Sequence, residues 1–417
     1  MADVVTVFLR NRGKILLTRR SAAVETYSGR WAGVSGYLEG DPADAVADAR
    51  RELREEVGLT DVRLIRAGEP LTVEDERTFT VHPFLFACED RDVATNWELA
   101  AVEWVPPTAM LDRETVPRLW ETYRRVAPTV ETVASDTEHG SAYLSVRALE
   151  VLRDRAAVVD DWEPVTRAAR ALRDARPSMA VLRNRINRVM DAATTERTPA
   201  AVHEHALDEL EAAFVADEGA AATAADVLAD IDGAVLTISR SGTVLAALRR
   251  AEVPVVVSES RPGREGVAVA ESVAADGSDV TLIPDAALSF ATAALDVGAI
   301  LVGADTVLPD GRVVNKVGTR GLGLAAAADE VPCYVVTATD KISHRVTAEL
   351  EDAAINADVD PRVNVWTPRF DVTSAVLFDG VLTERGRLAV ADVKEVAAEH
   401  ERRARWGDGP DESAATP

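Results

Sequence analysis

Three glutamates, Glu52, Glu55 and Glu56, fall within the stretch RRELREEVGL at residues 50–59. On a helix, residues spaced i, i+3 and i+4 lie on one face, so these three carboxylates are expected to converge. Like charges at i and i+4 repel by roughly 0.2–0.5 kcal/mol, which disfavours Glu52 beside Glu56 unless a cation lies between them. Oxygen ligands at this spacing suit Mg²⁺ or Mn²⁺, which also bind phosphate oxygens. The alternative is a solvated acidic surface, because the chain has 70 Asp and Glu against 46 Lys and Arg.

The helix that would carry these carboxylates has clear start and stop signals. Asp41 can act as the N-cap, Pro42 suits the first helical position, and Gly58 follows the last periodic residue. The pattern predicts a helix from Pro42 to Val57 that packs on a sheet and keeps the carboxylates on an exposed neighbouring face. The apolar stripe expected to face the sheet is Val46, Ala49, Leu53 and Val57.

The composition limits what the rest of the chain can be. Its 417 residues exceed what one core usually serves, so we expect two or more domains. A formal net charge of −24 would repel the phosphate backbone over most of the surface and disfavours nucleic acid as a partner. The chain is acidic, Ala-rich and Lys-poor, which is typical of proteins from salt-loving organisms. Its four lysines are Lys14, Lys316, Lys341 and Lys394.

Signals for export or membrane insertion are missing from the sequence. No run of roughly 18 apolar residues could span a bilayer. The N-terminal stretch lacks the basic, apolar and small-residue order of a signal peptide. Cys88 and Cys333 are the only cysteines. We therefore expect a cytoplasmic protein with no disulfide and no membrane partner.

The order of predicted elements divides the chain into three regions and a tail. Residues 1–125 alternate short strand-like runs with turns around one helix, which predicts a mixed sheet. Residues 126–232 have helical spacing and predict a helical subdomain. In residues 233–400 apolar strands recur about every 20 to 25 residues between helix-length segments, which predicts a parallel sheet covered on both faces. Residues 401–417 are interpreted as a polar tail.

The stretch from Arg51 to Leu59 fits the R-E-U-x-E-E-x-G-U core of the Nudix box, where U is aliphatic, and residues 1–125 resemble the Nudix hydrolase family. The resemblance extends to Gly36 and implies an α/β fold, namely an α/β/α sandwich with a mixed sheet. It further implies hydrolysis of a diphosphate linkage in a nucleoside diphosphate derivative, with Arg51 orienting a carboxylate at the substrate site. The implied catalytic residues, and ligands of Mg²⁺ or Mn²⁺, are Glu52, Glu55 and Glu56.

One residue of the family pattern is replaced. The first Glu of the box falls on Ala43 by backward count from Arg51, and the segment that begins at Gly36 is one residue longer than usual. Only Asp41 or Asp44 could take its place. Glu98 matches a position where relatives often carry a further acidic residue, and a surface charge is the equal alternative.

Polar clusters follow several predicted strands of the second half. Carboxyl ends of parallel strands and helix N-termini both favour anions, so these clusters suggest a phosphorylated ligand. An ordinary Gly/Pro turn is the alternative for each of them. The clusters are LTISRSGTV (236–244), SESRPGREG (258–266), IPDAA (283–287), GADTVLPDGRVVNKVGT (303–319) and TATDKIS (337–343).

Together these segments make residues 125–395 resemble the family shared by the alpha, beta and delta subunits of translation initiation factor 2B, methylthioribose-1-phosphate isomerase and ribose-1,5-bisphosphate isomerase. The resemblance implies a Rossmann-like parallel α/β domain after the helical subdomain, and a homo-oligomer formed through it. Asp305 stands where an Asp of the isomerases works as catalytic acid or base, and a structural role for it is equally open. The positions that approach the substrate in those relatives are Arg261, Asn315 and Lys316 here.

The cysteine that works with this Asp in the isomerases is absent. Where they have T-H-C-N, this chain has Thr237-Ile238-Ser239-Arg240, so a hydroxyl of far higher pKa replaces a thiol. Ser239 and Arg240 are expected to contact a ligand, while aldose to ketose isomerisation is in doubt. For Lys316 the alternative is an ion pair that fixes the loop, and for His139 it is a capping role at a helix start.

These patterns support three hypotheses. The first is a Nudix pyrophosphohydrolase fused to a domain that binds a phosphorylated sugar or nucleotide. The second is a regulatory or assembly factor related to initiation factor 2B, in which the Nudix domain senses nucleotides. The third is an isomerase that uses Asp305 without the cysteine.

Overall fold

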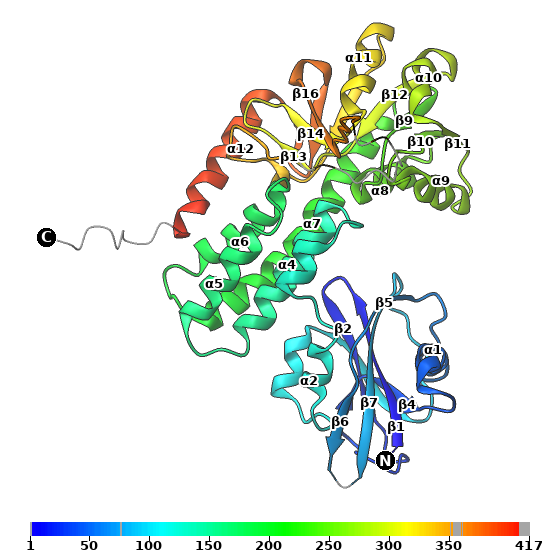
Figure 1. Ribbon diagram of the computed structural model, residues 1–417, viewed down its shortest axis with the longest axis vertical. Helices are drawn as coiled ribbons and strands as arrows, with labels where there is room; N and C mark the ends of the chain where they lie inside the picture. The colour runs from blue at the N-terminus through cyan, green and yellow to red at the C-terminus, as the bar shows by residue number, and fades with distance from the viewer. Residues whose placement is uncertain (1, 76, 351, 353–359, 361, 408–417) are drawn as a thin grey trace, which may run out of the picture. The chain divides into compact units, whose positions relative to one another are not determined.

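The computed structural model describes residues 2–75, 77–350, 352, 360 and 362–407. The chain divides into two compact units, the first comprising Met1–Thr129 with Arg153–Val158 and the second Val130–Leu152 with Val159–Pro417. Figure 1 traces the chain from blue at the N-terminus to red at the C-terminus. Among the described residues, none of the helices combines the length and apolar character needed to cross a bilayer. Cys88 and Cys333 are both free.

The first unit is built on an eight-stranded sheet. Strands β1 and β7 pair in parallel and the other neighbours are antiparallel, which confirms the predicted mixed sheet. Strand β6 is an element that the sequence patterns did not predict. The strands are β1 (Ala2–Asn11), β2 (Lys14–Arg20), β3 (Trp31–Ala32), β4 (Val34–Tyr37), β5 (Arg63–Ala67), β6 (Leu71–Glu74), β7 (Thr78–Ala87) and β8 (Leu99–Val105).

Helices cover both faces of this sheet, with α1 (Ala45–Val57) on one side and α2 (Leu119–Arg124) on the other (Figure 1). Alternation along β1 explains the two cores, because Val7 packs with α1 and Phe8 packs with α2. The predicted helix is present, although its first turn, Pro42–Asp44, is a 3₁₀ helix (η1). Asp41 caps η1, and Gly58 ends α1 in the left-handed conformation at φ 73°. A second 3₁₀ helix, η2 (Pro107–Asp112), precedes α2.

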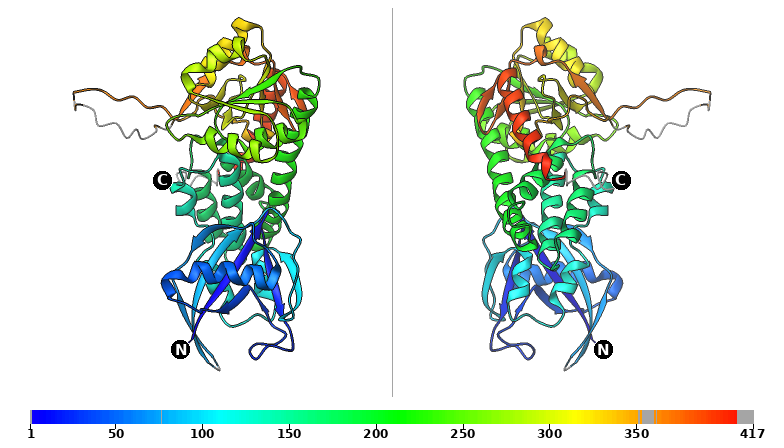
Figure 2. Two further views of the ribbon diagram at one scale, coloured as in Figure 1. Left: turned by 90° about the vertical axis from the view of Figure 1, so that its right-hand side faces the viewer. Right: turned by 90° about the vertical axis from the view of Figure 1, so that its left-hand side faces the viewer.

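Residues 130–228 are helical, and residues 234–403 form a second sheet with its own helices. The helices of the first stretch are α3 (Val130–Ser135), α4 (Ser141–Ala156), α5 (Trp162–Arg173), α6 (Ala180–Ala192) and α7 (Pro199–Leu228). Those of the second are α8 (Gly242–Ala251), α9 (Glu265–Ala275), α10 (Leu288–Ala294), α11 (Thr319–Asp329) and α12 (Val390–Arg403). The red helix α12 packs beside α6 (Figure 2).

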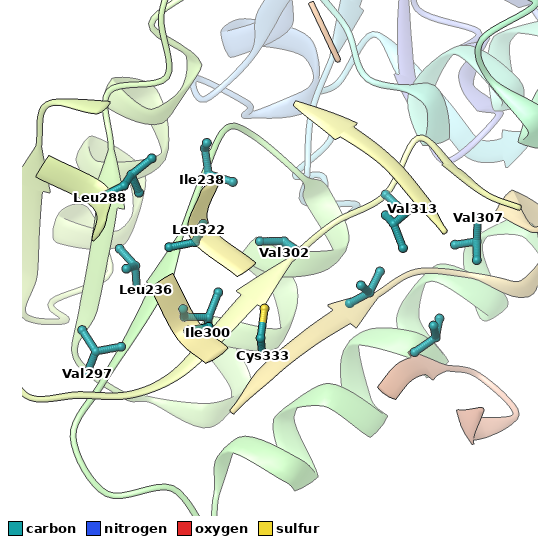
Figure 3. Packing of buried hydrophobic residues seen from close by; sticks show 14 of the residues in the cluster. Leu236, Ile238, Leu288, Val297, Ile300, Val302, Val307, Val313, Leu322 and Cys333 are labelled. Atoms are coloured by element: carbon teal, nitrogen blue, oxygen red, sulfur yellow. The ribbon is translucent and has the colours of Figure 1, made fainter. Parts of the chain in front are cut away.

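The sheet of the second unit runs β11-β10-β9-β12-β15-β17-β18, and all neighbours are parallel except β17 and β18. Its two faces bury separate clusters, because Leu236 and Ile300 point to one side and Val235 and Leu301 to the other. Figure 3 shows part of the first cluster, with Leu236, Ile300 and Leu322. This confirms the predicted parallel sheet covered on both faces. The strands are β9 (Ala234–Thr237), β10 (Val255–Ser258), β11 (Val280–Ile283), β12 (Val297–Val302), β15 (Cys333–Val336), β17 (Gly380–Thr383) and β18 (Gly386–Leu388).

A small antiparallel sheet and several 3₁₀ turns lie beside the large sheet. The small sheet comprises β13 (Thr306–Val307), β14 (Val313–Lys316) and β16 (Phe370–Thr373), so Asn315 and Lys316 lie on a strand. The turns are η3 (Asp285–Ala287), η4 (Thr339–Lys341), η5 (Ala375–Leu377) and η6 (Ala404–Gly407). The segment interpreted as a polar tail, 401–417, is helical through Gly407, and its residues 408–417 lie outside the described residues.

Replacing Leu53 by Ala should destabilise the first unit by about 2–5 kcal/mol, because this fully buried side chain fills the space between α1 and the sheet. Its neighbour Arg54 is exposed on the same helix and supplies the matched control. Arg54→Ala should change stability by no more than about 0.5 kcal/mol. Urea unfolding of the three proteins, followed by tryptophan fluorescence, measures the difference. Equal midpoints for both variants would contradict the packing described.

Candidate functional site

The carboxylates of α1 do not share one exposed face. Glu52 and Glu56 are buried, with exposed fractions of 8% and 3%, whereas the Glu55 side chain is 53% exposed. The prediction of an exposed face was therefore wrong for Glu52 and Glu56. The reason is β4, which covers this side of the helix: the Glu52 carboxylate lies against Gly36 and the Glu56 carboxylate accepts a backbone hydrogen bond from Ser35.

The Glu52 carboxylate lies directly against the backbone of β4 at Gly36. A Cβ atom added at Gly36 would stand 1.9 Å from Glu52 Oε1, far inside van der Waals contact. Only glycine therefore leaves room for this carboxylate at its observed position. Gly36, which the sequence resemblance singled out as the start of the box, is needed here for a close approach rather than for a turn.

Burial disfavours the charged form of the Glu52 and Glu56 carboxylates. Burial, together with the charges of Glu52 and Glu98, raises the pKa of Glu56 to about 8, although Arg20 and a backbone hydrogen bond from Ser35 oppose the change. The pKa of Glu52 is also raised, mainly by burial and against the pull of Arg51. The structure thus brings Glu98 toward Glu52 and Glu56.

Arg51 lies among four carboxylates. It donates to Asp48 Oδ1 at 2.8 Å and pairs with Glu52 at 2.9 Å, Glu55 at 3.4 Å and Glu39 at 3.5 Å. Pairing with Glu52 agrees with the orienting role implied by the resemblance, which stays a prediction. Asp48, one turn before Glu52 and 91% buried, is a residue that sequence reasoning missed. Asp41 and Asp44, the candidates to replace the first Glu of the box, are both exposed.

Among the described residues, no three His, Cys, Asp or Glu side chains are already arranged to hold a metal ion. Glu52 and Glu56 nevertheless have the character of cation ligands, since both are carboxylates whose pKa values are raised mainly by burial and further by neighbouring carboxylates. A divalent cation bound to their oxygens would remove that penalty. Glu98 is a third carboxylate near this pair, whereas the Glu55 side chain is largely exposed.

A cavity of about 150 Å³ in the first unit is lined by Glu98 and by Ser35 and Gly36, the two β4 residues next to the buried carboxylates. We call it the Tyr27 cavity. Its walls are mainly apolar and aromatic, with Arg20 and Glu98 as the charged groups. The main apolar wall residues are Val4, Tyr27, Val73, Phe79, Val81 and Leu119.

A second cavity, of about 310 Å³, lies in the second unit at the carboxyl ends of β9 and β12. We call it the Ser239 cavity. The predicted ligand contacts that line it are Ser239, Arg240, Asp305, Asn315 and Lys316. Arg261 is not among its lining residues. The Arg261 side chain is 62% exposed and pairs with Glu259 at 3.2 Å, because the turn after β10 directs it away.

Ser239 adopts a left-handed backbone conformation, φ 65°, where β9 turns into α8. Its N–H donates to Ser260 Oγ at 2.7 Å, which holds the turn. Ser241 caps α8, accepting from Val244 N–H at 3.4 Å, so the N-terminus of a ten-residue helix faces the cavity beside Gly242. Partial positive charge at this end favours an anion.

The alternative proposed for Lys316, an ion pair, is present. Lys316 Nζ donates to both carboxylate oxygens of Glu265 at 3.0 and 3.1 Å, and both side chains line the Ser239 cavity. Asn315 donates to Thr319 Oγ1 at 3.0 Å and is 93% buried. The partner of Lys316 is a Glu at the start of α9, which sequence reasoning did not identify.

Lys341 lines the same cavity and was also missed as a site residue. It is 95% buried and donates to the Ala304 carbonyl at 2.7 Å. Burial lowers the pKa of Lys341, while nearby Asp305 raises it. The scarcity of lysine in the chain was a signal that could have pointed to it.

His139 also lines the Ser239 cavity. Its Nδ1 lies 2.8 Å from Asp136 Oδ2, and its ring stacks on Tyr143 with centroids 4.1 Å apart. The turn before α4 therefore brings an Asp–His pair to the cavity, with the ring held flat against an aromatic neighbour.

A buried ion network holds the turn that carries Lys341. Asp340 accepts from Arg185 Nε at 2.9 Å and pairs with Arg188, and these two cations keep the pKa of Asp340 below its usual range although burial opposes them. Next to it, His400 Nε2 donates to the Thr339 carbonyl at 3.1 Å. Burial lowers the pKa of His400 to about 4.

Comparison with known proteins identifies both halves. The family model described as the initiation factor 2 subunit family matches residues 137–390, and the model described as the NUDIX domain matches residues 1–126. Ribose 1,5-bisphosphate isomerase of Haloferax volcanii is 31% identical over 322 residues, which is 70% of this chain and 97% of the relative. Methylthioribose-1-phosphate isomerase of Gemmatimonas aurantiaca is 36% identical over 174 residues, so the chain spans about half the length of that relative, 51%.

Solved structures also match more than half of the chain. Translation initiation factor eIF-2B of Pyrococcus horikoshii has a TM-score of 0.55 at 25% identity, covering 62% of this chain and 94% of that one. The 5-methylthioribose 1-phosphate isomerase of the same organism has a TM-score of 0.53 at 21% identity, covering 73% and 90%, and shows a shared fold. These findings confirm both resemblances drawn from the sequence and the mixed α/β architecture.

His400 should make stability depend on pH. Between its ordinary pKa of 6.5 and the folded value of about 4, the unfolded chain binds a proton that the folded chain does not, so stability falls as the pH is lowered through this range. His400→Gln keeps a polar side chain without this proton, and its stability should fall less. Thermal unfolding of both proteins at pH 7, 5.5 and 4.5 measures the difference. An equal loss of stability on acidification in the wild type and in His400→Gln would contradict this role of His400.

Proposed function

Because the chain belongs to the initiation factor 2 subunit family and begins with a NUDIX domain, we propose that it joins a metal-dependent pyrophosphohydrolase to a domain that binds a phosphorylated sugar or nucleotide. The observation that supports the hydrolase most strongly is the pair of buried carboxylates, Glu52 and Glu56. They contact Gly36 and Ser35, two residues in the wall of the Tyr27 cavity. We propose a nucleoside diphosphate derivative as the substrate.

The residues of the first unit suit this reaction. Tyr27 and Phe79 offer flat apolar surfaces to a base, and Arg20 offers a positive charge for a phosphate. Glu52 and Glu56, with Glu98, would hold Mg²⁺ or Mn²⁺, which supplies charge neutralisation at the diphosphate and lowers the pKa of a water molecule. Arg51 pairs with the Glu52 carboxylate at 2.9 Å and would hold it in place.

Glu56→Gln should lower Mg²⁺-dependent hydrolysis by more than about 100-fold, because it removes a charged oxygen ligand while keeping the shape of the side chain. The assay follows cleavage of nucleoside diphosphate sugars, dinucleotides and nucleoside triphosphates at high salt. Mn²⁺ binding, followed by electron paramagnetic resonance, should weaken in parallel. Glu74→Gln, at an exposed position on β6, is the matched control. A hydrolysis rate in Glu56→Gln equal to that of the wild type would contradict the hydrolase assignment.

The Ser239 cavity supports phosphate binding in the second unit. A helix N-terminus, Lys341 and the Lys316–Glu265 pair face a space of about 310 Å³. Ser239 has a hydroxyl where a thiol is needed for isomerisation in the relatives, so we propose binding without turnover. The bound form would regulate the protein or its assembly, and we propose that the second unit also forms a homo-oligomer.

Lys341→Met should weaken the binding of ribose 1,5-bisphosphate by about tenfold or more, because it removes a charge-assisted hydrogen bond inside a buried cavity. Lys394→Met replaces an exposed lysine of the same unit and should leave binding unchanged. Isothermal titration calorimetry on the full chain compares the three proteins. No binding of this or related phosphates to the wild type would favour an assembly module.

The isomerase alternative rests on Asp305, which lines the cavity close enough to Lys341 to raise its pKa. An assay for ribulose product separates the two proposals. Product formed by the wild type and lost in Asp305→Asn would replace binding without turnover by isomerisation.

A further inference from the structure

A small cavity of about 40 Å³ in the second unit is lined by a buried arginine. Arg183, on α6, is 95% buried, and its buried Nε has no hydrogen-bond partner among the described residues. The cavity has room for a small ion, since one water needs about 10–15 Å³. Other lining residues are Ser178, Thr306, Ser343, Arg345 and Glu349. We call this the Arg183 cavity.

The charges around Arg183 leave a net positive site. Burial, together with the charge of Arg345, lowers the pKa of Arg183 to about 10, so the group is still charged near neutral pH. Asp174 is nearby, but both its oxygens accept hydrogen bonds from Arg173 at 3.1 and 2.9 Å. The carboxylate of Glu349 stands 4.0 Å from Arg345, at the limit of an ion pair.

A buried guanidinium without an acceptor is costly, because its lost hydration is not replaced. A second orphan atom lies next to it: His344 Nδ1 is buried without a partner among the described residues. Burial and the neighbouring Arg183 and Arg345 lower the pKa of His344. The unpartnered Nε of Arg183 fits a missing acceptor of negative charge.

We propose that the Arg183 cavity is a second oxyanion site, which binds a phosphate group through Arg183 and Arg345. Arginine presents N–H groups in a planar fork that matches the oxygens of phosphate. The start of α6 contributes Ala180 to the cavity wall, so the positive end of a thirteen-residue helix points the same way.

The two cavities of the second unit share their walls. Asp305 lines the Ser239 cavity and Thr306, the next residue, lines the Arg183 cavity. Likewise, Lys341 and Met179 line the Ser239 cavity, whereas the nearby Ser343 and Ser178 line the Arg183 cavity. Thr306 Oγ1 ties two of these segments together, because it donates to the Ser178 carbonyl and accepts from Ala180 N–H. An ion behind this wall would therefore bias the backbone that carries Asp305 and Lys341.

Calorimetric titration of inorganic phosphate tests the site on the full chain. The Lys341→Met background weakens the Ser239 cavity, so that the remaining binding reports the Arg183 cavity. Adding Arg183→Met should weaken phosphate at least about tenfold, whereas adding Arg250→Met, at an exposed position on α8, should not. Glu349→Gln should tighten binding, because it removes the competing carboxylate.

Two outcomes would overturn the proposal. One is equal phosphate affinity with and without Arg183; if Arg183→Met does not fold, Arg345→Met, at a partly exposed position, gives the same comparison. The other is no phosphate binding in the Lys341→Met background, which would leave water as the occupant.

The proposed coupling between the Arg183 cavity and the Ser239 cavity also rests on the proposed function, namely that the Ser239 cavity binds a phosphorylated ligand. In the wild type, phosphate should change the affinity for ribose 1,5-bisphosphate by about fivefold or more, and Arg183→Met should abolish this change. If phosphate instead competes directly at the Ser239 cavity, its effect on ribose 1,5-bisphosphate affinity would persist in Arg183→Met. That result would overturn the coupling between the two cavities. Phosphate binding at the Arg183 cavity is tested separately by the titration above.

Discussion

Burial of charge without full compensation is the constraint on which both candidate sites depend. Taking an ion out of water costs several kcal/mol unless partners replace its hydration. The first unit buries Glu52 and Glu56 side by side, and the second buries Lys341 and Arg183 beside cavities. Each group is held by a packed scaffold against this cost. Each therefore attracts a ligand of opposite charge more strongly than a hydrated surface residue would.

The scaffold that holds these groups is stiff for identifiable reasons. In the first unit α1 is fixed by Leu53 and Val57 against the sheet, and Gly36 allows the Glu52 carboxylate to touch the backbone of β4. In the second unit the ion pairs of Asp340 fix the turn after β15. The Lys341 ammonium is therefore held in the interior, where it donates to the Ala304 carbonyl, instead of being hydrated. Ion pairs in the interior act here as positioning devices more than as sources of stability.

The second unit has a cavity at the strand ends where Ser239 replaces the cysteine of the isomerase pattern. Ser239 occupies the turn where relatives have a thiol, and a hydroxyl gives up its proton far less readily. Lys316 is already paired with Glu265, so an anionic ligand must compete with a carboxylate or approach through Lys341. Both features favour recognition over turnover. The shared wall between the Ser239 and Arg183 cavities gives such recognition a route to regulation.

The sequence by itself determined the helix of the Nudix box, the mixed sheet around it and the parallel sheet of the second half. Period, caps and apolar runs are local properties, and they specify local elements. It also placed Ser239 and Asp305 after strands of the parallel sheet, and they line one cavity because strand ends in such a sheet meet at one edge.

Only the tertiary structure decided which of the predicted site residues are buried away from solvent. Glu56 is buried and Glu55 exposed because β4 covers one side of α1 at Ser35 and Gly36, and helical spacing cannot encode that. Glu98 approaches from the distant segment just before β8. Arg261 was expected at the ligand and points outward, while Lys341 was overlooked and points inward. Desolvation depends on contacts between remote parts of the chain, and periodicity along the sequence does not contain them.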